Sequence, residues 1–381
     1  MASPAEDRIT LRVAGGEHRD WTSYSIDSDL LTLADAWRVS LGIPAQKIPA
    51  SIRPWAQVEV LLGGDIILTG RIDRIEREVA KDTQTLSLSG RDGAAVLVDC
   101  SAPIFTQREA TLQEVVDLVA RPLGILRTDV RANGRYGGRK EKVAIEPGMT
   151  AWDALKQACE ANGCWAWCEP DGTLVVGGPD YAAAPVATLV TTFDGKGNNT
   201  LSLSVREDVS GRYSEVTVLG QTHGTEDQEG KNSIMHRETD PDVPGYRPLI
   251  IAEGECDDVA EAERRARKTL MDSRLEGFEI AARVRGHRVG GQSGEPWKPG
   301  QRVHVLSEPH GLDGVYFLMK RVFIGGKDRG RVTELTLKED GVWLPELADK
   351  ATTRKKGKQG PGEVVDLYQN CPSVQTHGGS Q

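Results

Sequence analysis

The chain has 381 residues, including 42 glycines and 19 prolines, and its formal net charge at pH 7 is −9. At about 150 residues per domain, this length predicts two or three domains. The glycine and proline content indicates many turns. The acidic balance argues against a basic nucleic-acid-binding surface, because phosphate binding needs clustered Lys and Arg.

The sequence has no apolar run near the ~20 residues of a membrane-spanning helix. Residues 1–7 also lack the basic and apolar regions of a secretory signal. Six cysteines in a chain of this length do not form a disulfide scaffold. We therefore expect reduced and mostly buried cysteines in a protein that is made in a cytoplasm.

Apolar and polar residues alternate along several short segments of the first hundred residues. The clearest examples are centred on Leu11, Val39, Val58 with Val60, and Leu86 with Leu88. A period of two is typical of half-buried strands in an antiparallel sheet. Residues 5–105 are therefore predicted to form a first β-barrel domain.

Helical patterns follow in residues 106–185. Thr111 and Glu114 have the spacing of a capping box, with apolar residues at helical spacing after them. A second helix is expected to begin at Thr150 and to end at Asn162. The alternating segment 164–168 and a turn after it predict a hairpin. This region is predicted to be a small inserted α+β domain.

Strand patterns return in residues 186–345, which are predicted to form a second β-barrel domain. Within it, residues 221–245 are polar and are expected to be a long mobile loop. Residues 257–271 are expected to be a helix, supported by Glu–Arg pairs four residues apart. Residues 346–381 form a polar tail that is expected to be flexible until it binds a neighbour.

One three-strand pattern occurs twice in the chain. Four landmarks correspond at offsets of 245, 247, 249 and 248 residues: Gln57 with Arg302, Arg74 with Arg321, Leu86 with Leu335, and Asp92 with Asp340. Any two β-meanders share some features, which is the alternative explanation. The agreement of four spacings favours a duplication and predicts two related barrels on either side of the insert.

Three cysteines, Cys159, Cys164 and Cys168, form the most compact cluster of reactive side chains. A structural zinc site usually has C-x2-C pairs and four ligands, which this spacing does not provide. Cys164 and Cys168 also fall on one face of the predicted strand. Burial in the core is the favoured interpretation, with a metal site and a disulfide as alternatives.

Other polar residues give no catalytic pattern. The seven histidines stand outside the known metal-binding motifs: His18, His223, His236, His287, His304, His310 and His377. Asp73 and Glu76 are interpreted as solvated charges rather than as paired catalytic carboxylates. The basic segment 131–142 is interpreted as an exposed loop, and the run 354–358 as a solvated tail or a contact with nucleic acid or an acidic protein face. The sequence therefore predicts no catalytic, cofactor-binding or metal-binding residue.

Several segments resemble a known family. Residues 86–92 with 97–102 are similar to a signature segment of the Mu-like phage baseplate hub protein, the tail protein P. Residues 297–303 with 314–318 resemble the closing barrel of the same group, and the helix at 257–271 is typical of it. The resemblance extends to late-control D proteins and to the amino-terminal part of VgrG secretion spikes.

The resemblance implies a structural protein and not an enzyme. It implies a homotrimeric ring in the baseplate of the virion tail, assembled from chains made in the bacterial host cytoplasm. Three chains with two barrels each would present six units to the hexameric tail tube, while the threefold ring would hold a trimeric central spike on a separate polypeptide. Other baseplate proteins would be partners. DNA would only pass through, helped by an acidic lumen that repels phosphates.

Three alternatives remain at this point. A VgrG-like secretion-system hub shares the same sequence features. A tail-associated peptidoglycan hydrolase would need a catalytic cleft, and a carbohydrate-binding module would expose aromatic side chains. The pair Trp165 and Trp167 is more simply explained as part of a core.

Overall fold

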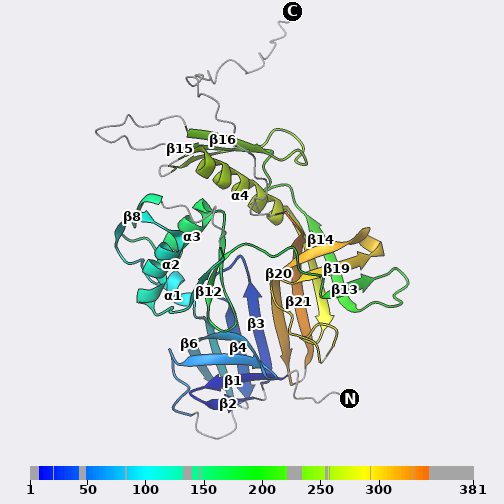
Figure 1. The fold of residues 1–381 in the computed structure, drawn as a ribbon. Helices are drawn as coiled ribbons and strands as arrows, with labels where there is room; N and C mark the ends of the chain where they lie inside the picture. The colour runs from blue at the N-terminus through cyan, green and yellow to red at the C-terminus, as the bar shows by residue number, and fades with distance from the viewer. Residues whose placement is uncertain are drawn as a thin grey trace, which may run out of the picture. The chain divides into compact units, whose positions relative to one another are not determined.

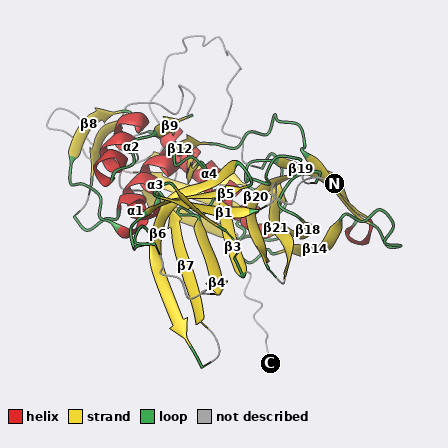
Figure 2. Ribbon diagram, turned by 90° about the horizontal axis from the view of Figure 1, so that it is seen from below, coloured by secondary structure: helices red, strands yellow, loops and turns green. Residues whose placement is uncertain are grey.

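The computed structural model describes residues 8–342 apart from Asp20 and residues 43–48, 82–83, 132–139, 146, 221–233, 254–255, 257, 292 and 328 (Figure 1). The predicted tail at 346–381, including the basic run 354–358, lies outside the described residues. The protein is β-rich, as predicted. Most of its strands belong to one large sheet, and Figure 2 shows most of the helices to one side of it.

Thirteen strands form this large sheet. Those from the first part of the chain are β1 (Ile9–Val13), β2 (Gly16–His18), β3 (Ser23–Asp29), β4 (Ala36–Gly42), β5 (Gln57–Leu62), β6 (Asp65–Val79) and β7 (Gln84–Asp92). Those from the last part are β13 (Ala187–Thr191), β14 (Thr200–Glu207), β18 (Phe278–Arg285), β19 (Arg302–Ser307), β20 (Leu312–Gly326) and β21 (Arg329–Glu339). A short 3-10 helix, Glu308–His310, joins β19 to β20.

The two halves of the sheet have the same order of strands. The first half runs β3-β4-β7-β6-β5-β1, and the second runs β14-β18-β21-β20-β19-β13. The duplication inferred from the sequence is therefore present in the topology. The halves differ at one end, because β1 pairs antiparallel with β5 whereas β13 pairs parallel with β19.

The strand pairings correct the alignment of the two copies by one residue at Arg74 and Asp92, and by two residues at Leu335, which corresponds to Leu88 and not to Leu86. β6 has a bulge between Ile72 and Arg74, and β20 has one between Leu318 and Lys320. Aligning the bulges matches Arg74 with Lys320, whereas the sequence comparison matched it with Arg321. A bulge adds an unpaired residue to one strand, and sequence spacing alone does not locate it.

The halves join edge to edge in the middle of the sheet. β20 continues beyond its pairing with β19, and residues Lys320–Gly325 pair antiparallel with residues Tyr24–Asp29 of β3. One continuous core of buried residues includes Ile26 and Trp37 from the first half and Phe323 and Leu335 from the second.

Residues 95–177 contain the predicted small α+β region. Its elements are α1 (Ala95–Asp99), β8 (Thr106–Ala110), α2 (Leu112–Ala120), a 3-10 helix (Arg121–Leu123), β9 (Thr128–Val130), β10 (Lys140–Ala144), α3 (Ala151–Ala161), β11 (Trp165–Cys168) and β12 (Leu174–Gly177). The capping box of Thr111 and Glu114 is confirmed, as is the N-cap at Thr150. Helices α2 and α3 pack on the β11–β12 hairpin around a separate hydrophobic cluster.

A second small sheet interrupts the last part of the chain. It contains β15 (Glu215–Gly220), β16 (Ile234–Thr239) and β17 (Pro248–Glu253), which pair only with one another, and α4 (Val259–Gly277) packs on it. The sequence analysis placed these residues within the second barrel and ended the helix at Met271. It also assigned residues 234–239 to a loop, because β16 has only one buried residue, Ile234, and so lacks a clear alternation.

Among the described residues, none of the helices combines the length and the apolar character that crossing a membrane requires.

Candidate functional site

The junction between the two halves is built around a buried cation, Arg321 on β20. Its side chain is 2% exposed, its Nη1 donates to the Ile26 carbonyl at 2.9 Å, and its Nη2 donates to the Ile67 carbonyl at 3.3 Å. The guanidinium also lies 4.0 Å from the ring centre of Phe323. Burial lowers the pKa of Arg321 to about 10, and the negative charges of Asp35 and Asp27 act against this. The group therefore remains charged at neutral pH and fastens β20 to β3.

Carboxyl groups next to this cation fix the corner between β3 and β4. Asp35 Oδ1 accepts from the Asp29 amide at 2.8 Å, and Asp92 accepts from the amides of Asp35 and Ala94. Loss of hydration and the neighbouring charge of Asp92 raise the pKa of Asp35 to about 8. Burial likewise raises the pKa of Asp92 to about 6. Both carboxyl groups are thus held by backbone donors of the first half, and Asp35 also interacts electrostatically with Arg321.

A buried histidine, His287, completes the junction. It is 0% exposed, and its two ring nitrogens lie 2.8 Å from the Tyr24 hydroxyl and 3.0 Å from Thr333 Oγ1. Burial lowers the pKa of His287 to about 3, so the ring is neutral at physiological pH. No sequence pattern predicts the burial of His287 or Arg321, because Arg321 has the local context of an ordinary strand residue and His287 lies just after the end of β18.

The chemistry of the junction is structural. Arg321 of the second half hydrogen-bonds to backbone carbonyls of the first half, and His287 of the second half lies within hydrogen-bond distance of the Tyr24 hydroxyl of the first half. These contacts fix how the halves meet. A buried cation with nearby carboxylates is costly to separate, because either charge left alone in the interior is poorly solvated. The junction therefore defines the relative position of the two copies.

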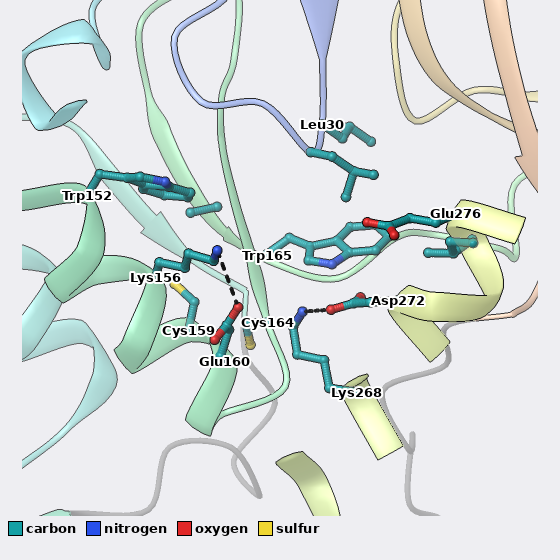
Figure 3. A pocket seen from close by; sticks show the side chains of 13 residues that line it. Leu30, Trp152, Lys156, Cys159, Glu160, Cys164, Trp165, Lys268, Asp272 and Glu276 are labelled. Carbon is teal, nitrogen blue, oxygen red and sulfur yellow. Dashed lines mark hydrogen bonds and ion pairs between the residues drawn. The ribbon is translucent and has the colours of Figure 1, made fainter. Parts of the chain in front are cut away.

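A cavity of about 210 Å³ lies between the α+β region and α4 (Figure 3). Lys156 and Glu160 project from α3, and Lys268 and Asp272 project from α4, with Trp165 between the two helices. The ion pairs measure 3.9 Å for Lys156–Glu160 and 2.5 Å for Lys268–Asp272. Arg265 of α4 also pairs with Glu160 of α3. The first two pairs lie within single helices, and the Arg265–Glu160 pair links α4 to the α+β region.

The three cysteines that the sequence analysis singled out contribute to the core, as the packing interpretation predicts. Cys159 and Cys164 are 2% and 4% exposed, Cys168 packs against the same cluster, and all three are free thiols. Burial raises the pKa of Cys164 to about 12 and the pKa of Cys159 well above its usual value. A thiol that stays protonated is a poor nucleophile and a poor metal ligand.

The tryptophan pair lies in the interior of the molecule. Trp165 is buried in a cluster with Leu30, Leu275 and Phe317, and Trp167 packs against that cluster. The sequence analysis expected a core position within the insert. The structure shows that this core also includes residues of both halves of the large sheet.

One group of residues has the composition of a metal site, which the sequence analysis did not find. Side-chain ligand atoms of His236, Glu238 and Glu263 lie within 4.8 Å of one another. However, Arg267 Nη2 lies 3.1 Å from Glu238 and 2.9 Å from Glu263, so a guanidinium already neutralises the carboxylates. The group is an ion-pair network that holds α4 on β16.

The other polar residues named from the sequence each have a different ion-pair partner. Asp73 pairs with Arg91 at 2.8 Å, whereas Glu76 lies 3.7 Å from Arg38. His304 pairs with Asp313 at 2.8 Å. Most of the basic segment 131–142 lies outside the described residues.

Four family models match successive parts of the chain. They describe a Mu phage baseplate assembly protein GpP-like N-terminal domain at residues 8–92, a baseplate hub protein gp44-like second domain at 94–178, a tail protein NMB1110-like third domain at 212–270, and a tail protein C-terminal domain at 272–342. The third model covers the small sheet and α4 as far as residue 270, and the fourth begins within α4 at residue 272 and continues through β18 to β21.

Whole-chain relatives agree with these models. The chain is 27% identical to the baseplate hub protein gp44 of Escherichia phage Mu over 96% of this chain and 97% of that protein. The crystal structure of the tail protein from Neisseria meningitidis MC58 matches with a TM-score of 0.77 and 38% identity, over 88% of this chain and 97% of that one. The 43 kDa tail protein of prophage MuSo2 from Shewanella oneidensis matches with a TM-score of 0.76 and 24% identity, over 88% and 100%.

The repeated sheet, its buried junction and these matches define a phage tail protein. More particularly, the chain belongs to the family of Mu-like phage baseplate hub proteins.

Proposed function

We propose that this protein is the structural hub of a contractile phage tail baseplate. Three copies form a ring that contains six copies of the repeated half. The observation that carries this proposal is the equal strand order of the two halves, joined by the β20–β3 pairing. A chain that already places two copies side by side needs only threefold assembly to present six equivalent units.

Such a ring adapts one symmetry to another. Its six units face the hexameric tail tube, and its three chains hold a trimeric central spike. In this proposal each half is a tube-like barrel, within residues 5–105 and 186–345, with the α+β domain 106–185 inserted between the halves and the small sheet with α4 inserted in the second half. A contact between β13 and β14, the two edge strands of the second half, supports a barrel. The amide of Asn199, just before β14, donates to the Val190 carbonyl of β13 at 3.3 Å.

The role is interfacial and mechanical. The hub closes the tube, carries the spike and other baseplate proteins in the virion, and opens a conduit for DNA during ejection. The net charge of −9 suits a passage for DNA, because an acidic lumen repels phosphates. The buried charges at the junction serve packing, which agrees with a structural role.

A VgrG-like secretion hub is the second candidate. The E. coli c3393 protein, a component of the type VI secretion system, has a similar fold with a TM-score of 0.54 and 10% identity. That likeness concerns the fold alone. Immunogold labelling of purified phage particles separates the two functions: labelling at the end of the tail supports the baseplate hub, and particles without the protein contradict it.

A further inference from the structure

Several strand edges of the large sheet lack a neighbour among the described residues: β2 and β13 each pair on one side only, and so do β14 and the outer part of β6. β6 extends past β5, so that its residues 73–79 pair only with β7. Residues 202–207 of β14 pair only with β18. Figure 2 shows β6 and β14 on opposite sides of the sheet. Unpaired edges expose backbone donors and acceptors that can pair with another chain.

The junction inside the chain shows how equivalent edges pair. There, the part of β20 beyond its bulge pairs with β3: Lys320 lies opposite Asp29, Val322 opposite Asp27, and Gly325 opposite Tyr24. β6 is the equivalent of β20, and β14 is the equivalent of β3. The free edges of β6 and β14 are therefore the two halves of a second copy of this junction, and each occurs once per chain.

The equivalence can be assigned residue by residue. One row of paired residues crosses four strands of each half: Ile72, Gly90, Trp37 and Ile26 in the first, and Leu318, Leu337, Ile280 and Val205 in the second. Seven of these eight residues are buried, and Val205 is half-buried on the free edge strand. The row fixes Ile26 as the equivalent of Val205 and, through the bulges, Lys320 as the equivalent of Arg74.

We infer that residues Arg74–Val79 of one copy pair antiparallel with residues Leu203–Asp208 of the next copy in the ring. This rests on the proposed function and specifies the contact between subunits. Transferring the internal register places Arg74 opposite Asp208, Glu76 opposite Arg206, and Val79 opposite Leu203. Because the two edges differ, the contact is head-to-tail, which is the type that closes into a ring.

The side chains of the two edges complement one another in this register. Within the chain, Lys320 and Asp29 form an ion pair at 3.6 Å, and their equivalents Arg74 and Asp208 again have opposite charges. Glu76 and Arg206 add a second opposite pair. No directly opposed positions carry like charges, which would destabilise the pairing.

Exposed apolar side chains at the same edges have a partner in this arrangement. Val79 is 73% exposed at the end of β6, and it would face the half-buried Leu203 of β14. Leu201, 47% exposed, follows two residues further along β14. Cross-strand apolar contacts of this kind stabilise a sheet. Pairing thus covers both the open backbone and the apolar end of each edge.

Disulfide cross-linking tests the register. In a Glu78→Cys, Ser204→Cys double variant, the two cysteines lie directly opposite each other across the subunit contact, within the ~4.4–6.8 Å between Cα atoms that a disulfide requires. Mild oxidation should give covalent dimers and trimers on a non-reducing gel. The matched control, Glu78→Cys with Ser202→Cys, shifts one cysteine by two residues and should give at least fivefold less cross-linked product. Equal cross-linking in the control would overturn the register.

A charge exchange tests the pairing without cysteines. Glu76→Arg should weaken self-association at least tenfold, as measured by light scattering over a concentration series. Adding Arg206→Glu should restore most of the loss. Arg206 also pairs with Glu279 of its own chain at 3.2 Å, so the informative step is the rescue of Glu76→Arg. A double variant that associates no better than Glu76→Arg would contradict the pairing.

The experiments distinguish a wrong strand pairing from a wrong proposal of a three-chain ring. If the wild-type protein has the mass of three chains but the Glu78–Ser204 variant does not cross-link, the ring stands and the strand pairing is wrong. If the wild-type protein has the mass of one chain at every concentration and the Glu78–Ser204 variant does not cross-link, the ring and the strand pairing are both wrong.

Discussion

Arg321 donates from Nη1 to the backbone carbonyl of Ile26, a residue 295 positions earlier in the chain, across 2.9 Å. This bond joins the two halves of the sheet at the place where β20 pairs with β3. Substitutions at this junction should therefore change the stability of the folded protein.

Replacing Arg321 with Ala should strongly destabilise the protein. The change leaves the neighbouring carboxyl groups without their buried cation and the two carbonyls without their donor. We expect a loss of ~3–5 kcal/mol in the free energy of unfolding, measured by urea denaturation. As a control, Arg283→Ala removes an exposed pair with Glu334 and should cost no more than ~1 kcal/mol. Similar effects of the two changes would contradict the structural role of Arg321.

The pKa of about 8 for Asp35 predicts a pH dependence of stability. Because this carboxyl holds its proton more tightly in the folded than in the unfolded protein, its contribution to stability falls as pH rises from about 4 to about 8. His287 titrates in the opposite sense at lower pH, since its pKa is lowered to about 3.

Asp35→Asn should therefore flatten the decline in stability between pH 7 and 8, where the contribution of His287 changes little because a histidine of the unfolded chain, with a pKa of about 6.5, is already mostly neutral. Urea denaturation at several pH values measures this slope. An unchanged slope in Asp35→Asn would show that Asp35 does not titrate in this range.

The buried thiols should resist modification. We expect Cys159 and Cys164 of the folded protein to react with a maleimide at pH 7.5 at least a hundredfold more slowly than in urea, because they are buried and protonated. Peptide mapping by mass spectrometry gives the rate for each cysteine. Rapid labelling of either one in the folded state would show that this core opens readily.

Gly90 should be intolerant of a side chain. A Cβ atom at this position would lie 1.9 Å from the Arg71 carbonyl oxygen and 2.8 Å from the Trp37 ring, in the row that crosses the first half. We expect Gly90→Ala to lower the free energy of unfolding by ~1–3 kcal/mol or more. Gly64→Ala, where a Cβ atom meets nothing within 4 Å, is the control and should stay near the wild-type value in the same denaturation experiment.

Sequence patterns predicted the elements whose burial is one-sided. Strand β4, with Trp37 and Val39 facing the core, and the capped helices α2 and α3 were predicted at nearly their observed positions. The outer part of β6 lacks this signal. Residues 76–79 are exposed on both faces in the single chain, so no apolar alternation marks them as a strand.

The junction could not be predicted for a different reason. Arg321 lies on a strand among charged and apolar neighbours, and only the distant β3 makes its position buried. The network of His236 with Glu263 likewise joins a strand to a helix across a segment that the sequence analysis took for a loop. In both cases the partners come from separate parts of the chain, and residue spacing carries no information about that contact.

The most direct test of the central claim is the mass of the purified full-length protein measured by native mass spectrometry, with negative-stain images of the same sample. The proposed hub predicts a particle of three chains with a central opening. A particle with the mass of one chain at all concentrations, and without an opening, would contradict it.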